Sequence, residues 1–258
     1  MSQPSRKGVA AAAAIPQEPS KPNEPETPTQ AIRTIPSPKA QALRHAHPAL
    51  LLGLFAIRFR ALVSDPVSTM QSSLPVVLAL QAGYTITCLP AAGSQGMKTF
   101  KKPRPGEKKK TGSDGAGPNI AVTTLVALVL SIVSAGALHV LLVLFGAPFL
   151  THIPHTFLCS LHLSLLGLYP LFYARGVASR DWLEIMSARA PFDEAFGGLV
   201  GAGVGAWLGA VPIPLDWDRE WQKWPVTILS GIYAGYAVGK LVGGTLVFGK
   251  RFGDVEAS

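Results

Sequence analysis

Two carboxylates separated by one tryptophan, Asp216-Trp217-Asp218, have residue types and a spacing that could do chemistry. Paired acidic side chains can hold a divalent cation, which prefers oxygen ligands and can in turn hold the phosphates of an activated sugar. Two simpler interpretations fit the same residues. Asp216 could cap a short helix and pair with Arg219 three residues later, or the local charges could contact lipid headgroups. We favour capping and surface ion pairs over catalysis.

Three histidines and a cysteine that lie close in sequence form a second candidate set, namely His152, His155, Cys159 and His162. Imidazole and thiolate are zinc ligands, and the last three residues would share one face of a helix. No carboxylate lies nearby in sequence to orient the imidazoles, and hydrogen bonds between membrane helices explain such side chains equally well. We therefore predict no metal site and no cofactor.

The elements that must position these residues are apolar. Of the 258 residues, 48% are hydrophobic and only 15% are charged, whereas soluble domains are nearer 25% charged. Six segments approach the roughly 20 apolar residues that a helix needs to cross a membrane. They are residues 47–64, 69–92, 119–146, 156–174, 193–213 and 226–248. The sequence therefore predicts an all-α polytopic membrane protein with about six transmembrane helices.

Segments of different composition flank and interrupt these helices. Residues 1–46 are rich in Pro, Ala, Ser and Thr and poor in aromatic residues, which predicts a disordered cytosolic tail. Residues 47–250 form the predicted transmembrane domain, which contains a basic cytosolic loop at 93–118. Residues 251–258 form a short C-terminal tail.

The distribution of basic residues sets the predicted orientation. Eighteen of the 23 Lys and Arg residues lie in the tail, in the loops after the second and fourth predicted helices, or at the C-terminus. Because cytosolic loops carry this excess, both termini are predicted to face the cytosol and the 212–225 loop to face the lumen. The most basic run, Lys98 to Lys110, is interleaved with Gly and Pro, and we predict no nucleic-acid partner.

The segment from Pro212 to Pro225 is bounded by prolines and holds three tryptophans. Trp217, Trp221 and Trp224 are spaced i, i+4 and i+7, so a short helix would place their rings on one face, at the level of the lipid headgroups. We therefore predict a lumenal platform that binds a partner protein or a lipid. Its predicted members are Trp207, Pro212, Pro214, Asp216, Trp217, Asp218, Arg219, Trp221, Trp224 and Pro225.

Glycine recurs at every fourth position in the last two predicted helices. Small residues let membrane helices approach closely, and packing then holds them together. We expect the two glycine faces to pack against each other; the alternative is that one of them docks a helix of another protein. The residues assigned to helix packing are Gly197, Gly201, Gly205, Gly209, Gly231, Gly235, Gly239 and Gly243, together with His139, which we expect to contact a neighbouring helix.

Three cations fall within the predicted helices. A charge at a helix centre costs about 2.5–3.5 kcal/mol on insertion scales, so Arg58 and Arg60 must reach the lumenal surface or meet an acid or a phosphate. Lys240 lies about two turns from the cytosolic end of the last helix, and we expect its ammonium group to extend to the membrane surface. The predicted lumenal loops are too short to assemble a nucleophile, a base and a metal, which argues against catalysis by this chain alone.

Two stretches of the chain resemble the PIG-F family, whose members act in glycosylphosphatidylinositol (GPI) anchor biosynthesis in the endoplasmic reticulum. The longer stretch runs from Gly205 to Pro225 and the shorter from His139 to Pro148, which ends in Gly-Ala-Pro. Glu220 departs from the family pattern, in which Pro is expected, and residues 93–117 look like a fungal-type insertion. The resemblance implies a small non-catalytic subunit that stabilises large ethanolamine phosphate transferases.

These observations combine into one leading interpretation. The chain is predicted to be a non-catalytic, multi-pass subunit of the endoplasmic reticulum membrane. It would bind and stabilise the large polytopic transferase that adds phosphoethanolamine to a mannose of the GPI precursor, and the GPI glycolipid is a second candidate ligand. The alternative is a lumenal-face glycolipid transferase or flippase that uses Asp216 and Asp218, and a third interpretation is a scaffold without an enzyme partner.

Overall fold

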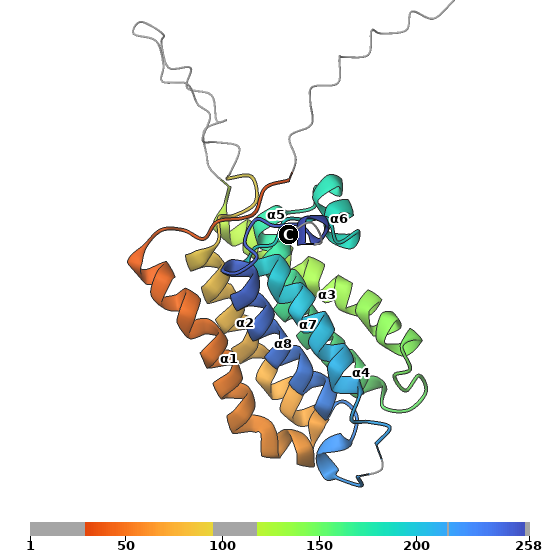
Figure 1. Ribbon diagram of the computed structural model, residues 1–258. Coiled ribbons are helices and arrows are strands. Elements are labelled where there is room, and N and C mark those ends of the chain that lie inside the picture. The colour runs from red at the N-terminus through yellow and green to blue at the C-terminus, as the bar shows by residue number, and fades with distance from the viewer. Residues whose placement is uncertain (1–28, 95–117, 216, 256–258) are drawn as a thin grey trace, which may run out of the picture.

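The computed structural model describes residues 29–94, 118–215 and 217–255. Over these residues the chain is helical and contains no strand, which confirms the predicted all-α class (Figure 1). The helices are α1 (Pro38–Ser64), α2 (Pro66–Cys88), α3 (Ile120–Leu144), α4 (Ile153–Leu163), α5 (Tyr169–Arg175), α6 (Ser179–Met186), α7 (Glu194–Ala210), α8 (Val226–Gly244) and α9 (Phe252–Val255). A π-helical turn, Ser164–Leu168, joins α4 to α5, and a 3-10 turn, Glu220–Gln222, precedes α8.

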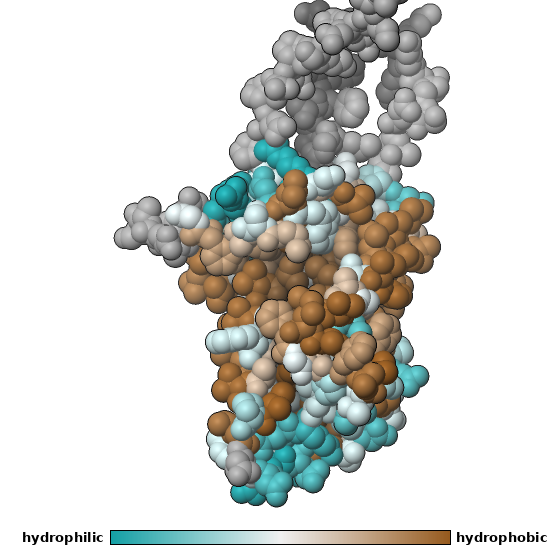
Figure 2. All heavy atoms as spheres, turned by 90° about the vertical axis from the view of Figure 1, so that its right-hand side faces the viewer, coloured by the Kyte–Doolittle hydropathy of each residue, from teal (hydrophilic) through white to brown (hydrophobic). Residues whose placement is uncertain are grey.

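Four of the described helices are long and apolar enough to cross a membrane: Pro38–Ser64, Ile120–Leu144, the continuous Ile153–Arg175 and Val226–Gly244. Helices α2 and α7 are outside this set, and α7 has only 17 residues. Membrane-spanning character is thus supported, whereas the count of six crossings stays a prediction. Figure 2 shows a broad apolar band between two polar ends on one face of the bundle, as expected for a protein embedded in lipid.

The long helices lie side by side in one bundle (Figure 1). Helices α7 and α8 make the most extensive pair, α1 packs against α2 and α8, and α3 packs against α4, the π-helical turn and α5. The main core cluster lies between these helices and includes Leu51, Met70, Leu166 and Ile232. The largest helix pairs are therefore neighbours in sequence, and the contact of α1 with α8 joins the two ends of the bundle's chain order.

The connection between α1 and α2 is a single residue, Asp65. Its backbone amide closes the last turn of α1, and its carboxylate accepts a hydrogen bond of 3.2 Å from the Ser68 amide at the start of α2. Pro66 follows at the first helical position, where a missing N–H costs nothing. The chain therefore reverses direction sharply at this end of the bundle.

The predicted boundary of the N-terminal tail at residue 46 was wrong. Helix α1 begins at Pro38, because Ser37 accepts a hydrogen bond from the Ala40 amide and caps the helix. The segment before it is also held to the bundle, since Ile32 is buried and the Ile35 amide donates to the Cys88 carbonyl at 2.8 Å. The disorder predicted for residues 1–28 and the basic loop at 95–117 lie outside the described residues.

Candidate functional site

The loop that joins α7 to α8 is organised by Gln222. Its side-chain amide donates to the carbonyls of Pro212 and Leu215, each at 2.8 Å, and its oxygen accepts from the Arg219 amide at 2.9 Å. Gln222 is itself buried, whereas Pro214 and Asp218 are exposed. The loop is thus closed on itself by one side chain that the sequence reasoning did not single out. Gln222 lies three residues after the N-cap residue Arg219, which is the spacing of a capping box. This spacing is the signal in the sequence that could have indicated the role of Gln222.

The predicted common face of three tryptophans was wrong. Only residues 220–222 form a helical turn, a 3-10 turn, so the i, i+4, i+7 spacing does not bring the three rings together. The rings of Trp217 and Trp221 lie 5.9 Å apart, whereas the Trp224 indole points to α4 and donates to the Thr156 hydroxyl at 3.2 Å. The loop therefore has an outward pair of indoles and one indole that fastens it to the bundle.

The other members of the predicted platform are separated along the structure. Trp207 lies on α7 with 67% of its surface exposed, and no ring contact joins it to the loop indoles among the described residues. Pro225 is buried at the start of α8. The predicted platform residues therefore do not form one flat surface, because Trp207 is exposed on α7 whereas Pro225 is buried.

The described acids of the loop do not form a ligand set for a metal ion. Asp216 lies outside the described residues, and Asp218 is exposed and adopts a left-handed backbone with a φ of 48°. Lys223 pairs with Glu220 at 3.1 Å, as predicted for local surface charges. Within the described part of the chain, no group of three His, Cys, Asp or Glu residues is placed to hold a metal ion.

The histidines of the second candidate set serve different contacts. His162 is buried, with one ring nitrogen 2.8 Å from the Tyr233 hydroxyl on α8 and the other 3.2 Å from the Met70 carbonyl on α2. The rings of His152 and His155 lie 4.9 Å apart at the N-terminus of α4. The His139 ring lies 6.2 Å from the Phe157 ring, which places it beside α4. Hydrogen bonds between helices thus account for His162, the rings of His152 and His155 pack on each other, and Cys159 is a free, buried thiol.

The arginines of α1 also differ from each other. Arg58 donates to the Ser72 hydroxyl on α2, whereas Arg60 is exposed. Ser72 also donates to the Ser68 carbonyl at 2.8 Å, so the arginine is bound to a side chain that is itself fixed. The predictions were that Arg58 reaches the membrane surface or meets an acid or a phosphate; among the described residues it meets a hydroxyl.

The glycine positions of α7 and α8 lie against each other. A Cβ atom added at Gly201, Gly205, Gly235 or Gly239 would lie less than 3.0 Å from the backbone of the opposite helix. The same is true of the remaining four predicted positions, Gly197, Gly209, Gly231 and Gly243. The two backbones are in direct contact, so any side chain at these positions would force the helices apart.

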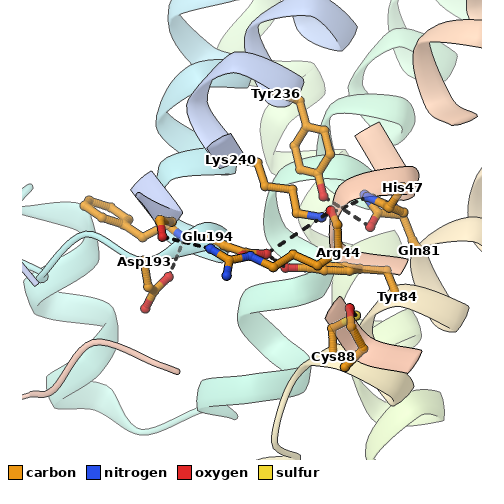
Figure 3. Close-up of polar contacts among 12 residues, drawn as sticks. Arg44, His47, Gln81, Tyr84, Cys88, Asp193, Glu194, Tyr236 and Lys240 are labelled. Atoms are coloured by element: carbon orange, nitrogen blue, oxygen red, sulfur yellow. Dashed lines mark hydrogen bonds and ion pairs between the residues drawn. The ribbon is translucent and has the colours of Figure 1, made fainter. Parts of the chain in front are cut away.

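A buried ionic cluster lies at the end of the bundle where α7 begins (Figure 3). Glu194 on α7 pairs with Arg44 of α1, accepts a 2.6 Å hydrogen bond from the Tyr84 hydroxyl of α2, and lies 3.8 Å from the Lys240 ammonium of α8. One carboxylate thus joins the other three helices to α7. None of these partners is near Glu194 in sequence, and the sequence analysis did not identify the cluster.

Lys240 lies inside this cluster, which corrects the expectation that it reaches the membrane surface. Only 1% of the residue is exposed. Its ammonium group lies 3.2 Å from His47 Nδ1 and 3.5 Å from the centre of the Tyr84 ring, and it donates to the Arg44 carbonyl at 3.4 Å. A carboxylate, an imidazole and an aromatic face thus hold the cation inside the bundle. Extension of the side chain to water would lose all of these contacts.

A second ion pair adjoins the first one in sequence. Asp193 caps α7 by accepting from the Phe196 amide at 2.9 Å, and its other oxygen is 2.6 Å from Arg175 at the end of α5. The same oxygen accepts from the Ile32 amide at 3.1 Å. The side chains of Asp193 and Arg175 are almost fully buried. Two consecutive acids therefore fix the start of α7 to α1, α2, α5 and α8 and to the segment before α1.

Comparison with known proteins decides the family. The family described as "GPI biosynthesis protein family Pig-F" matches residues 46–244. The chain belongs to this family. A Neurospora crassa protein named "Glycosylphosphatidylinositol anchor biosynthesis protein 11" is 58% identical over 216 residues, which cover 84% of this chain and 79% of the relative. The matched region, residues 46–244, includes the glycine helices, the tryptophan loop and, from the buried ionic cluster, Tyr84, Glu194 and Lys240 but not Arg44.

More distant relatives extend the match across fungi to animals. The protein of the same name in Aspergillus fumigatus is 38% identical and covers 82% of this chain and 81% of its own length. A human protein named "GPI ethanolamine phosphate transferase, stabilizing subunit" is 34% identical over 124 residues, which cover 46% of this chain and 57% of the human protein. No solved structure matches the chain significantly. The resemblance to the Pig-F family seen in the sequence is thus confirmed.

Proposed function

We propose that this chain is the non-catalytic subunit that binds and stabilises a GPI ethanolamine phosphate transferase. The observation that carries the proposal is its membership of the Pig-F family together with the name of the human relative, a stabilizing subunit of that enzyme. The enzyme adds phosphoethanolamine to mannose of the GPI precursor, so its partner subunit must reside in the same membrane. The all-α bundle with its apolar band supports such a location.

The polar groups inside the bundle support a binding role over a catalytic one. The buried charged side chains Arg175, Asp193, Glu194 and Lys240 are all engaged with one another or with neighbouring helices. His162 is likewise occupied by hydrogen bonds on both ring nitrogens. A catalytic group must instead be free to meet its substrate in a concave site. The alternative of a glycolipid transferase or flippase would have to rest on Asp216 and Asp218, and Asp218 is exposed on the loop.

The proposed setting is the endoplasmic reticulum membrane, with both termini in the cytosol and the loop from Pro212 to Pro225 in the lumen. The two described ends of the chain meet, since Arg251 donates to the Thr29 carbonyl at 3.0 Å. The loop lies at the opposite end of the bundle (Figure 1). The proposed partner is a large polytopic transferase, and the loop's outward indoles are suited to its surface or to the glycolipid headgroup.

Depletion of the chain from cells tests the proposal. We expect the amount of transferase protein to fall while its messenger RNA is unchanged, and GPI precursors lacking phosphoethanolamine to accumulate. Re-expression of the unchanged chain and of Asp218→Asn should restore both readouts equally. Normal transferase levels with complete precursors would contradict the proposal. Failure of Asp218→Asn alone, with normal transferase levels, would favour the enzymatic alternative.

A further inference from the structure

A long apolar groove of about 890 Å³ runs along the seam between α7 and α8. Its floor is formed by the glycines of both helices, and its walls are formed by Val200, Val204 and Leu208 of α7 and by Ala234, Val238 and Val242 of α8. The two backbones touch at the glycine positions, and the groove follows this contact. None of the described residues that line the groove is charged.

The walls of the groove are open to the outside. Val204 is 52% exposed, Leu208 is 55% exposed and Val238 is 60% exposed. In a membrane these side chains face lipid or another protein. Apolar exposure alone does not distinguish the groove from α3, whose outer face is also apolar, with Leu125 and Val133 61% and 68% exposed. The difference is that the groove is concave and α3 is not among its lining elements.

One residue that lines the groove carries a buried polar group without a partner in the described part of the chain. Thr227 lines the groove and is only 7% exposed. Its hydroxyl has no hydrogen-bond partner among the described residues. The neighbouring Ser230, by contrast, donates to the Val226 carbonyl at 2.7 Å. An unpaired hydroxyl in an apolar setting is unfavourable. A hydrocarbon chain could not satisfy it, whereas a side chain or a backbone carbonyl of another helix could.

The length of the groove also favours a helix over a lipid. Helix α7 has 17 residues and α8 has 19, which correspond to about 25 and 28 Å at 1.5 Å per residue. The groove extends from Phe192 and Phe252 at one end to Trp221 and Phe59 at the other. It thus approaches the whole hydrocarbon thickness of roughly 30 Å, whereas a lipid chain covers only the half that belongs to its leaflet.

We propose that this groove docks one uncharged transmembrane helix of the ethanolamine phosphate transferase, which presents a hydrogen-bonding group to Thr227. The inference rests on the proposed function, since it names the surface by which the subunit holds its enzyme. A ridge of side chains on the incoming helix fills the space above the glycines. Association in lipid is driven by such packing and by interhelical hydrogen bonds, because lipid supplies no hydrophobic drive.

Two variants of the full chain test the docking surface. Val204→Trp and Val238→Trp fill the groove from its exposed walls without touching the backbone contact between α7 and α8. We expect each to reduce co-purification with the transferase in mild detergent by about tenfold or more, which corresponds to about 1.4 kcal/mol. The matched controls are Leu125→Trp and Val133→Trp, equally exposed on α3, which should co-purify like the unchanged chain.

A third variant removes only the unpaired hydroxyl. Thr227→Val keeps the shape of the side chain, so it leaves the fold undisturbed, and we expect a roughly threefold loss of co-purification from one interhelical hydrogen bond in a membrane. If the tryptophan variants fail to accumulate, this variant decides the matter by itself. Unchanged co-purification of the groove variants would overturn the docking inference, and so would unchanged co-purification of Thr227→Val where the groove variants do not accumulate.

Photo-crosslinking identifies the occupant directly. A benzophenone amino acid at position 238 of the full chain in native membranes should crosslink to the transferase, and the same group at position 133 should not. Crosslinks from position 238 only to lipid, or only to a second copy of the chain, would overturn the inference. These results leave the proposed function standing if the unchanged chain still co-purifies with the transferase and depletion still lowers its level. Loss of those two results would refute the proposed function itself.

Discussion

At the scale of single residues, the carboxylate of Glu194 has the largest effect that we expect from one side chain. It faces the buried ammonium of Lys240 and the partly buried guanidinium of Arg44, and it accepts a hydrogen bond from the Tyr84 hydroxyl. Glu194→Gln keeps the shape but leaves two cations without their acid, and breaking a buried pair in this way costs about 3–5 kcal/mol. We predict a marked fall in the midpoint of thermal unfolding in detergent and a lower cellular level of the chain.

A second substitution tests whether charge is the cause. Removing the excess cation as well, in Glu194→Gln with Lys240→Gln, should be less damaging than the sum of the two single changes, because the uncompensated charge is gone. Glu220→Gln is the control, since it breaks only the exposed pair with Lys223 and should change stability by about 1 kcal/mol or less. Equal effects of Glu194→Gln and Glu220→Gln would show that the cluster is not essential for stability.

At the scale of secondary-structure elements, the contact between α7 and α8 can be tested with two glycines of one helix. Gly205→Ala would place a Cβ atom against the Gly231 carbonyl, whereas Gly203→Ala meets no atom within 4 Å. Alanine improves intrinsic helix stability by about 1 kcal/mol at either position. We therefore predict that Gly203→Ala preserves or raises thermal stability, and that Gly205→Ala lowers it because overpacking costs about 1–3 kcal/mol. Equal stability of both variants would contradict direct backbone contact.

The helices also show which parts of the structure a sequence can predict. The glycine seam was predictable because its signal is local and repeats every four residues in two adjacent helices. The cluster around Glu194 was not, since Arg44, Tyr84 and Lys240 come from three other helices, and no local pattern chooses among distant partners. The tryptophan loop was mispredicted because its spacing was interpreted with helical geometry, whereas prolines and the left-handed backbone of Asp218 prevent a regular helix there.

At the scale of the whole molecule, the proposed topology places the loop before α8 in the lumen and the segment after α6 in the cytosol. Both native cysteines, Cys88 and Cys159, are free and buried, so a cysteine introduced on the surface can be labelled selectively. Glu220 and Ser187 are exposed, on either side of α7. In sealed vesicles of endoplasmic reticulum, we predict that a membrane-impermeant maleimide labels Ser187→Cys at once and labels Glu220→Cys only after permeabilisation.

The physical basis of this prediction is the distribution of charge. Basic residues are retained on the cytosolic side, and the exposed surface around Ser187 includes Arg189, whereas the 212–225 loop balances Arg219 and Lys223 with acids. Opposite labelling of the two positions requires α7 to cross the membrane. Helix α7 has only 17 residues, but its length of about 25 Å is close to the hydrocarbon thickness of thin bilayers. The unchanged chain should remain unlabelled in both conditions. Labelling of both introduced cysteines in sealed vesicles would show that α7 does not cross the membrane and would contradict the predicted six spans.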